Sequence, residues 1–453
     1  MELQVCDFWA CRLERRSGSG RGVWWCCVLA LGLLGGRLGA ADGLTLEEAL
    51  AQAQAANARL PIAAREVEVS RQKEREARAE RWLKVSLEGD VIYSPPSSYD
   101  ATVTNLGEER FQVIGRQPLY DGGARRAAVL RAQAGTSAAS ARHRMAVKDV
   151  DLEVRGRFSE CAQAESEIAA RREGIERLQR YRTSLRSRQA SGQGVAADIL
   201  KTEVRLASEE ADLAGAERRR DGARLELNDL MGRDPQAALE LAPLADPAPP
   251  PAAEPEAWQK APELLEAEAN RRSAESDLHI ARAERKPVLF ASADGGLWGS
   301  DTSHLVPPDL KAATPDAGFG DRLRRDAGYS LSVTFTWPLW DLGGRRARLA
   351  QAELALTQAS GQEEMRRRQA RLQWEQARAA IAGTYREIQI LTRALPDARD
   401  SYLEAESRYR GGAASSLEVL EAHTASVDAA VRLSDAMLRY RMAEALSIRW
   451  GTP

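Results

Sequence analysis

The chain has 453 residues, in which 64 basic side chains are almost balanced by 66 acidic ones. This length is enough for two or three ordinary domains, so a single small core is not expected. Because basic and acidic residues are intermixed, the sequence lacks the basic surface that nucleic acid requires, and nucleic acid is excluded as an expected partner.

The first element in chain order is a secretory signal peptide, which we expect at residues 1–41. Arginines up to Arg21 precede an apolar run at 23–34, and small residues follow as far as Ala41. The run is too short to cross a bilayer as a helix, so we expect export rather than anchoring. Four of the five cysteines lie in this segment, which leaves the mature chain with Cys161 alone and no possible intrachain disulfide.

The rest of the chain contains an internal duplication. ARAERWLKV at 77–85 recurs as ARAERKPVL at 281–289, and PLYDGGARR at 118–126 recurs as PLWDLGGRR at 338–346. The spacing between copies grows between these two pairs, which places the extra residues in an exposed loop. The predicted organisation is a signal peptide at 1–41, a first repeat at 42–240, a proline-rich linker at 241–258 and a second repeat at 259–453.

Each repeat contains two predicted strands. The segments lie at about 83–93, 110–120, 287–298 and 328–340, and the first and the last alternate apolar and polar residues, as in YSLSVTFTW. Lengths near ten residues with aromatic ends are typical of transmembrane barrel strands. The aromatic side chains expected at the membrane interfaces are Tyr93, Tyr120, Trp298, Trp337 and Trp340.

A soluble four-stranded sheet covering a core is the alternative interpretation of these strands. The long helices favour the membrane interpretation over the soluble one, because their apolar seams are too narrow to cover a sheet. Four strands cannot close a barrel, and open strand edges are prohibitive in lipid, whereas three chains would supply twelve strands and close it.

The long segments at about 124–188 and 344–410 are predicted to be helices. Apolar residues recur there every seven positions, as in Val154, Cys161 and Ile168, which is typical of a coiled-coil seam. At 1.5 Å per residue such helices approach ~100 Å. Each is followed by a glycine-containing turn and a returning helix, so each repeat is predicted to be a long helical hairpin joined to a strand hairpin. Pro396 predicts a bend that the first repeat lacks, because its counterpart there is Glu176.

A search for catalytic chemistry finds no enzyme signature. The sequence contains no metal-ligand spacing, phosphate loop or nucleophile constellation. The four histidines, including His423, are scattered and are expected on the surface, and Cys161 is expected in the helical seam. We therefore predict a protein that is not an enzyme and has no cofactor or bound metal.

From about 44 to 452 the sequence resembles the TolC-like outer-membrane efflux proteins. The motifs that carry the resemblance are LTLEEALAQAQAANARL, PLYDGGARR, GQGVAADIL, PLWDLGGRR and GGAASSLEVLEA, in that order. The resemblance implies a mainly α-helical chain with transmembrane β-strands, contributing four strands and two long helical hairpins to a homotrimer. The trimer would be a twelve-stranded barrel in the outer membrane of a Gram-negative cell, continued by a twelve-helix tunnel through the periplasm.

The resemblance also implies a function. Such a trimer is the outer-membrane channel of a tripartite efflux or type I secretion system, a passive conduit surrounded by outer-membrane lipid. Its partners would be a periplasmic adaptor and an inner-membrane pump of the RND, MFS or ABC type. The alternative is that this chain is itself a periplasmic adaptor with coiled-coil hairpins, but two tandem hairpins and girdled strands favour the channel.

Gate residues follow from the same resemblance. The family's acidic pair matches Glu418 and Glu421, its tyrosine matches Tyr409, and the aspartate that the tyrosine contacts matches Asp198. The family's network arginine falls on Ala414, so Arg408 or Arg410 would have to replace it. The ordinary alternatives are a solvated helix face for the glutamates and a last seam position for Tyr409. The expected adaptor-contacting tips are Gly192, Gly194, Gly411 and Gly412.

Overall fold

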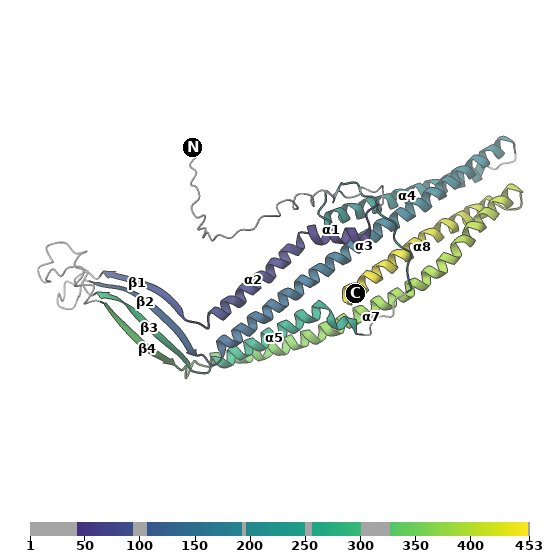
Figure 1. The fold of residues 1–453 in the computed structure, drawn as a ribbon. Coiled ribbons are helices and arrows are strands. Elements are labelled where there is room, and N and C mark those ends of the chain that lie inside the picture. The colour runs from purple at the N-terminus through teal and green to yellow at the C-terminus, as the bar shows by residue number, and fades with distance from the viewer. Residues whose placement is uncertain (1–42, 94–106, 193–195, 250–255, 300–326, 452–453) are drawn as a thin grey trace, which may run out of the picture. The chain divides into compact units, whose positions relative to one another are not determined.

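A computed structural model describes residues 43–93, 107–192, 196–249, 256–299 and 327–451, and the predicted signal peptide lies outside these ranges. The first repeat contains α1 (Leu46–Ala56), α2 (Arg59–Ala79), β1 (Lys84–Tyr93), β2 (Gly107–Tyr120), α3 (Ala124–Ala190) and α4 (Ala196–Leu230). The second contains the short 3-10 helix η1 (Ala257–Lys260), α5 (Pro262–Ala283), β3 (Val288–Gly299), β4 (Ala327–Thr336), α7 (Gly344–Arg410) and α8 (Ser416–Trp450) (Figure 1).

The long helices of the two predicted repeats match in length. Helices α3 and α7 each have 67 residues, and the returning helices α4 and α8 each have 35. Both pairs begin 220 positions apart, so the repeat spacing read from the motifs holds over the whole of each hairpin. Helix α7 continues through Pro396 without a break, and a bend at this residue stays a prediction.

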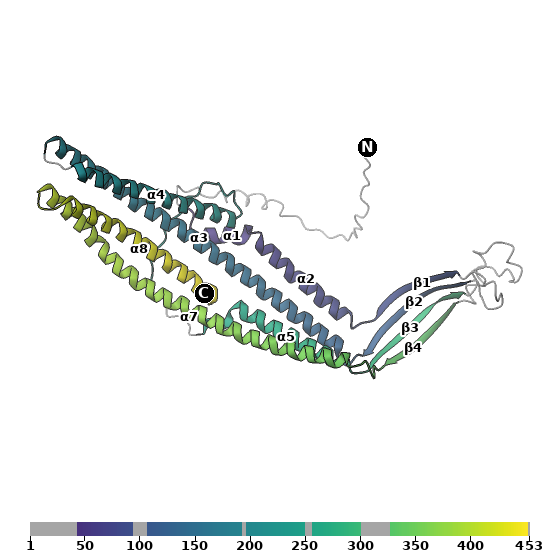
Figure 2. The same ribbon diagram turned by 180° about the vertical axis from the view of Figure 1, so that it is seen from behind.

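The helices pack in pairs along their lengths. Helix α3 lies against α2, α4, α5 and α8, and α7 lies against α5 and α8, as both views of the chain show (Figures 1 and 2). Seam residues such as Val154, Cys161 and Ile388 are buried, as the seven-residue period predicts. Burial raises the pKa of the Cys161 thiol to about 11, so this thiol is protonated at neutral pH.

The four strands form one antiparallel sheet in the order β1-β2-β3-β4. In the described residues β1 pairs only with β2 and β4 pairs only with β3, so both outer strands have an open edge. Cross-strand pairs fix the register on one face, where Arg110 donates to Asp90 at 2.6 Å and the hydroxyls of Ser292 and Ser332 lie 2.7 Å apart.

The two faces of this sheet differ in chemistry, as the alternation predicted. The polar face carries Ser86, Asp90, Arg110, Ser292, Asp294, Ser330 and Ser332. Large apolar side chains on the other face are exposed, namely Leu83, Val85, Leu87, Val91, Phe111, Val113, Tyr329, Leu331, Val333 and Phe335. A sheet that exposes its apolar face to water would be unstable, so this face needs an apolar environment.

The predicted end of the last strand is wrong. We expected this strand to reach residue 340, but β4 ends at Thr336. Proline has no N–H to donate to the ladder, so Pro338 stops the pairing. The equivalent Pro118 lies inside β2, where the register with β3 shifts between Pro118 and Tyr120. As a result, Trp337 and Trp340 lie between strand and helix rather than within a strand.

No helix within the described ranges combines the length and the apolar character needed to cross a membrane.

Replacing Pro396 by alanine should stabilise the protein by about 1–3 kcal/mol, because an interior proline removes a hydrogen bond and costs about 3 kcal/mol relative to alanine. Pro396 is exposed, so the change removes no packed side chain. Denaturant unfolding followed by circular dichroism measures the effect. The control is Glu176→Ala at the equivalent exposed position of α3, which should change the free energy of unfolding little. Equal effects of the two substitutions would contradict a cost specific to proline.

Candidate functional site: the strand–helix junctions and the helix tips

An aspartate caps each long helix where it leaves the sheet. The Asp121 carboxylate accepts hydrogen bonds from the backbone N–H groups of Gly123 and Arg125, both at 2.9 Å. Asp341 makes the same pair of bonds in the second repeat. These bonds satisfy two of the N–H groups that a helix start leaves unpaired and place a negative charge at the positive end of the helix dipole. The recurring PLYD and PLWD motifs therefore help to fix the direction in which each helix leaves the sheet.

The residue after each aspartate has a left-handed backbone. Gly122 has φ 68° and its repeat counterpart Leu342 has φ 52°, the single positive φ among the described non-glycine residues. A Cβ added at Gly122 would lie 2.9 Å from the side chain of Lys286, so glycine is required there by packing as well as by conformation. Leu342 is 84% exposed and keeps its side chain in solvent, but carries the cost of the left-handed conformation.

Leu342→Gly should stabilise the protein by about 0.5–1 kcal/mol, because it removes left-handed strain of about 1–2 kcal/mol and loses part of that gain to the greater freedom of the unfolded chain. The reference substitution is Gly122→Ala, which introduces both the strain and the contact with Lys286 and should destabilise. Thermal unfolding of the two variants gives the comparison. If Leu342→Gly were destabilising, the Leu342 side chain would be making contacts that outweigh its backbone strain.

The hairpin tips turn on left-handed glycines. Gly192 follows the end of α3 with φ 78° and Gly412 follows the end of α7 with φ 77°, whereas Gly411 is right-handed. Gly194 lies outside the described residues. Helix α8 then begins with a capping box, in which the Ser415 hydroxyl accepts from the Glu418 N–H.

Tyr409 links the two hairpins near their tips, but not through the residues expected. Its ring makes an edge-to-face contact with Tyr181 at 5.4 Å, and the Arg188 guanidinium lies over it at 5.2 Å. Arg188 also donates to the Tyr409 carbonyl at 3.0 Å. Within one chain the arginine at Tyr409 is thus Arg188, and a role for Arg408 or Arg410 in the gate network stays a prediction.

The other expected members of the network lie nearby with different partners. Arg408 donates to the Ala413 carbonyl and Arg410 pairs with Glu406. Asp198 is half-buried near the start of α4, and its carbonyl accepts from the Thr202 hydroxyl. No hydrogen bond joins Asp198 to Tyr409 within the described ranges. The arginine that contacts Tyr409 comes from the opposite hairpin, where Arg188 is the repeat counterpart of Arg408.

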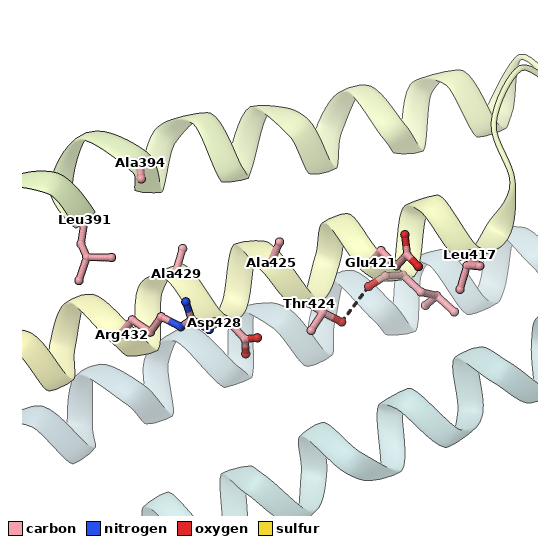
Figure 3. Close-up of a pocket in the computed structure, with 10 residues that line it drawn as sticks. Leu391, Ala394, Leu417, Glu421, Thr424, Ala425, Asp428, Ala429 and Arg432 are labelled. Atoms are coloured by element: carbon pink, nitrogen blue, oxygen red, sulfur yellow. Dashed lines mark hydrogen bonds between the residues drawn. The ribbon is translucent and has the colours of Figure 1, made fainter.

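The two gate glutamates have different surroundings. The Glu418 carboxylate accepts from the Ser415 N–H, so this side chain helps to cap α8. Glu421 is exposed and lines a groove of about 630 Å³ between α7 and α8 (Figure 3). Asp428 lies seven residues further along α8 in the same groove, a carboxylate that sequence analysis missed although the seven-residue spacing indicates it.

His423 was expected on the surface, but this expectation is wrong. Its side chain is fully buried on α8, and neither ring nitrogen has a hydrogen-bond partner. Its ring packs edge-to-face on Tyr402 of α7, with 5.7 Å between the ring centroids. The positive charges of Arg177 from α3 and Arg205 from α4 also act on the imidazole. Burial and these two arginines lower the pKa of His423 to about 3, so the imidazole is neutral where the four tip helices meet.

This histidine should make the helical tips acid-labile. Because the pKa of His423 is about 3 in the folded protein and 6.5 for an ordinary histidine, the unfolded chain binds the proton first as pH falls. The resulting loss of stability begins below pH 6.5 and reaches about 2 kcal/mol at pH 5. His423→Gln should flatten this part of the curve of unfolding free energy against pH, whereas His279→Gln at an exposed position should not. A curve unchanged by His423→Gln would contradict a neutral buried imidazole.

The predicted aromatic girdle is described in part. Tyr120, Trp337 and Trp340 are exposed at the ends of the strands that adjoin the helices, and the Trp337 indole donates to the Arg285 carbonyl at 3.4 Å. Tyr93 and Trp298 lie at the opposite ends of β1 and β3, where only the backbone is described. Among the described residues, no three His, Cys, Asp or Glu side chains lie close enough to hold a metal ion.

A sheet with one exposed apolar face, joined to two long helical hairpins, defines a membrane-channel subunit with a helical extension. The sequence profile described as outer membrane efflux protein matches residues 46–233 and 255–446. The chain therefore belongs to the outer membrane efflux protein family. It lies in the outer membrane with its helices in the periplasm, and it is a channel protein rather than a periplasmic adaptor.

Solved structures show the same fold. The outer membrane protein VceC of Vibrio cholerae has a TM-score of 0.79 at 19% identity, over 89% of this chain and 95% of that one. The outer-membrane channel MtrE of Neisseria gonorrhoeae, in its open state, has a TM-score of 0.76 at 18% identity, over 89% of this chain and 88% of that one. These relatives are channels and not enzymes. A comparison with curated proteins gives no significant match.

Proposed function

We propose that three copies of this chain close a twelve-stranded barrel that continues into a twelve-helix tunnel, forming a passive conduit for exported substrates. The observation that carries the proposal is the sheet with two open edges and one exposed apolar face. In hydrocarbon an unpaired backbone group costs several kcal/mol, so β1 of one copy needs β4 of another. A periplasmic adaptor and an inner-membrane pump of the RND, MFS or ABC type would complete the export system.

The tips of the two hairpins carry opposite charge, which supports their meeting around a ring. Residues 177–205 at the first tip contain seven basic and two acidic side chains, and the equivalent 397–425 contain three basic and six acidic ones. In a trimer these tips alternate, so each acidic tip has a basic tip on both sides. Attraction of this kind favours the closed arrangement and weakens with salt.

The gate is proposed at the acidic tips. Three copies would bring Glu418, Glu421 and Asp428 toward a common axis, where crowded carboxylates attract cations. Adaptor contact at the tip glycines Gly192, Gly194, Gly411 and Gly412 would separate the hairpins and open the pore. The cap made by Glu418 leaves Glu421 and Asp428 as the freer charges.

Neutralising the acidic tip should reduce cation selectivity. The double variant Glu421→Gln/Asp428→Gln, recorded as single channels in planar bilayers, should show weaker cation preference and weaker block by multivalent cations. Glu418→Gln should have a smaller effect on selectivity, because the Glu418 carboxylate already accepts a hydrogen bond from the Ser415 N–H and exposes less of its charge to the pore. Ser415→Ala is the control for the cap, since it loses the cap hydrogen bond without changing charge. Unchanged selectivity in the double variant would mean that both residues belong to a solvated helix face and not to a gate.

The trimer itself has a separate test. Native mass spectrometry of the mature chain extracted from outer membranes should give the mass of three copies. A monomer that retains helical structure after mild extraction would contradict barrel closure by three chains.

A further inference from the structure

We infer that a pocket at the first strand–helix junction binds the headgroup of an anionic phospholipid in the periplasmic leaflet of the outer membrane. The pocket has a volume of about 470 Å³ and lies between the end of α2, β2 and the start of α3. Its lining is Arg78, Arg81, Trp82, Gln117, Val129 and Gln133. The inference rests on the outer-membrane location and not on conduction through the pore.

The position of the pocket matches the depth of lipid headgroups. Gln117 shares its side of β2 with Val113 by strand alternation, and Val113 is on the exposed apolar face. Trp82 is 72% exposed between this face and the helices, where an indole suits the membrane–water interface. The strand ends that adjoin the helices are the periplasmic ends, so the pocket opens toward the periplasmic leaflet.

The chemistry of the pocket suits a phosphate ester. Arg78 is exposed, and one of its guanidinium nitrogens pairs with Glu74, which leaves further N–H groups to donate. Arg81 is exposed, and its backbone carbonyl accepts from the Gln117 amide at 3.3 Å, which fixes the chain beside the pocket. Two guanidinium groups next to amide side chains favour phosphate, and their charge favours an anionic headgroup over a zwitterionic one.

The equivalent strand–helix junction of the second repeat can be compared with this pocket. Trp337, the counterpart of Gln117, donates to the Arg285 carbonyl just as Gln117 donates to the carbonyl of Arg81. A bulky indole thus occupies the place of the amide, and Glu353 stands at the position of Gln133. The backbone contact is the same in both repeats, but the second repeat has an indole in place of the Gln117 amide, a carboxylate in place of the Gln133 amide and Lys286 in place of Trp82.

The pocket is formed within one chain. Its walls come from α2, β2 and α3, whereas the edge at which another copy would pair is the outer side of β1. A neighbouring copy is therefore not needed to complete it, and one lipid would bind for each chain.

Native mass spectrometry of the detergent-solubilised protein, titrated with phosphatidylglycerol or phosphatidylethanolamine, tests the inference. Phosphatidylglycerol should bind at least about tenfold more tightly, because it lacks the ammonium that the arginines repel. Arg78→Gln/Arg81→Gln should weaken its binding about 30-fold, at about 1 kcal/mol for each arginine. The matched control Arg282→Gln/Arg285→Gln, at the equivalent positions of the second repeat, should change binding less than about threefold.

A further variant fills the pocket without removing its positive charge. Gln117→Trp introduces the residue of the second repeat and should abolish tight binding while leaving both arginines in place. Equal binding of the two lipids, equal losses in the two arginine pairs, or unchanged binding in Gln117→Trp would each overturn the inference. Displacement of phosphatidylglycerol by millimolar inorganic phosphate would also overturn it, because the pocket would then be a site for a soluble anion. Single-channel conductance of the same variants reports independently on pore function.

Discussion

Unpaired strand edges in a bilayer are the constraint on which the rest of this structure depends. One chain contributes a sheet whose outer strands β1 and β4 each have one partner in the described residues, and lipid offers no replacement hydrogen bonds. Each strand hairpin continues into long helices through aspartate-capped junctions at Asp121 and Asp341. In the proposed trimer, strand pairing that satisfies these edges would also set the helical hairpins side by side, so that closure in the membrane and formation of the tunnel would be one event.

Much of this fold could be predicted from the sequence, because its strongest signals are periodic. The seven-residue seam predicted the bounds of the long helices to within two residues, and strand alternation predicted the two faces of the sheet. Contacts between segments that are distant in sequence were harder to predict. The burial of His423 and the packing of Arg188 on Tyr409 depend on which helices meet, and no local pattern specifies this. The early end of β4 could have been predicted, since Pro338 cannot donate to a ladder.

The two repeats share backbone contacts at positions where their side chains differ in size and charge. Gln117 and Trp337 donate to equivalent carbonyls, and Gly122 and Leu342 share a left-handed conformation. The side chains around these shared positions have diverged in size and charge, as have the basic and acidic tips. Two nearly equivalent scaffolds can thus carry different surfaces at equivalent positions.

The matched lengths of the hairpins restrict how this protein can change. Each arm has the same number of residues in both repeats, whereas the strand-connecting segments 94–106 and 300–326 differ in length. One residue inserted into α3 alone would rotate every later seam position by about 100° around the helix. A whole heptad would restore the seam but lengthen one arm by about 10 Å, so that the tips would no longer end at one level. Evolution of tunnel length therefore requires paired insertions in both repeats, while the strand-connecting segments can vary in length singly.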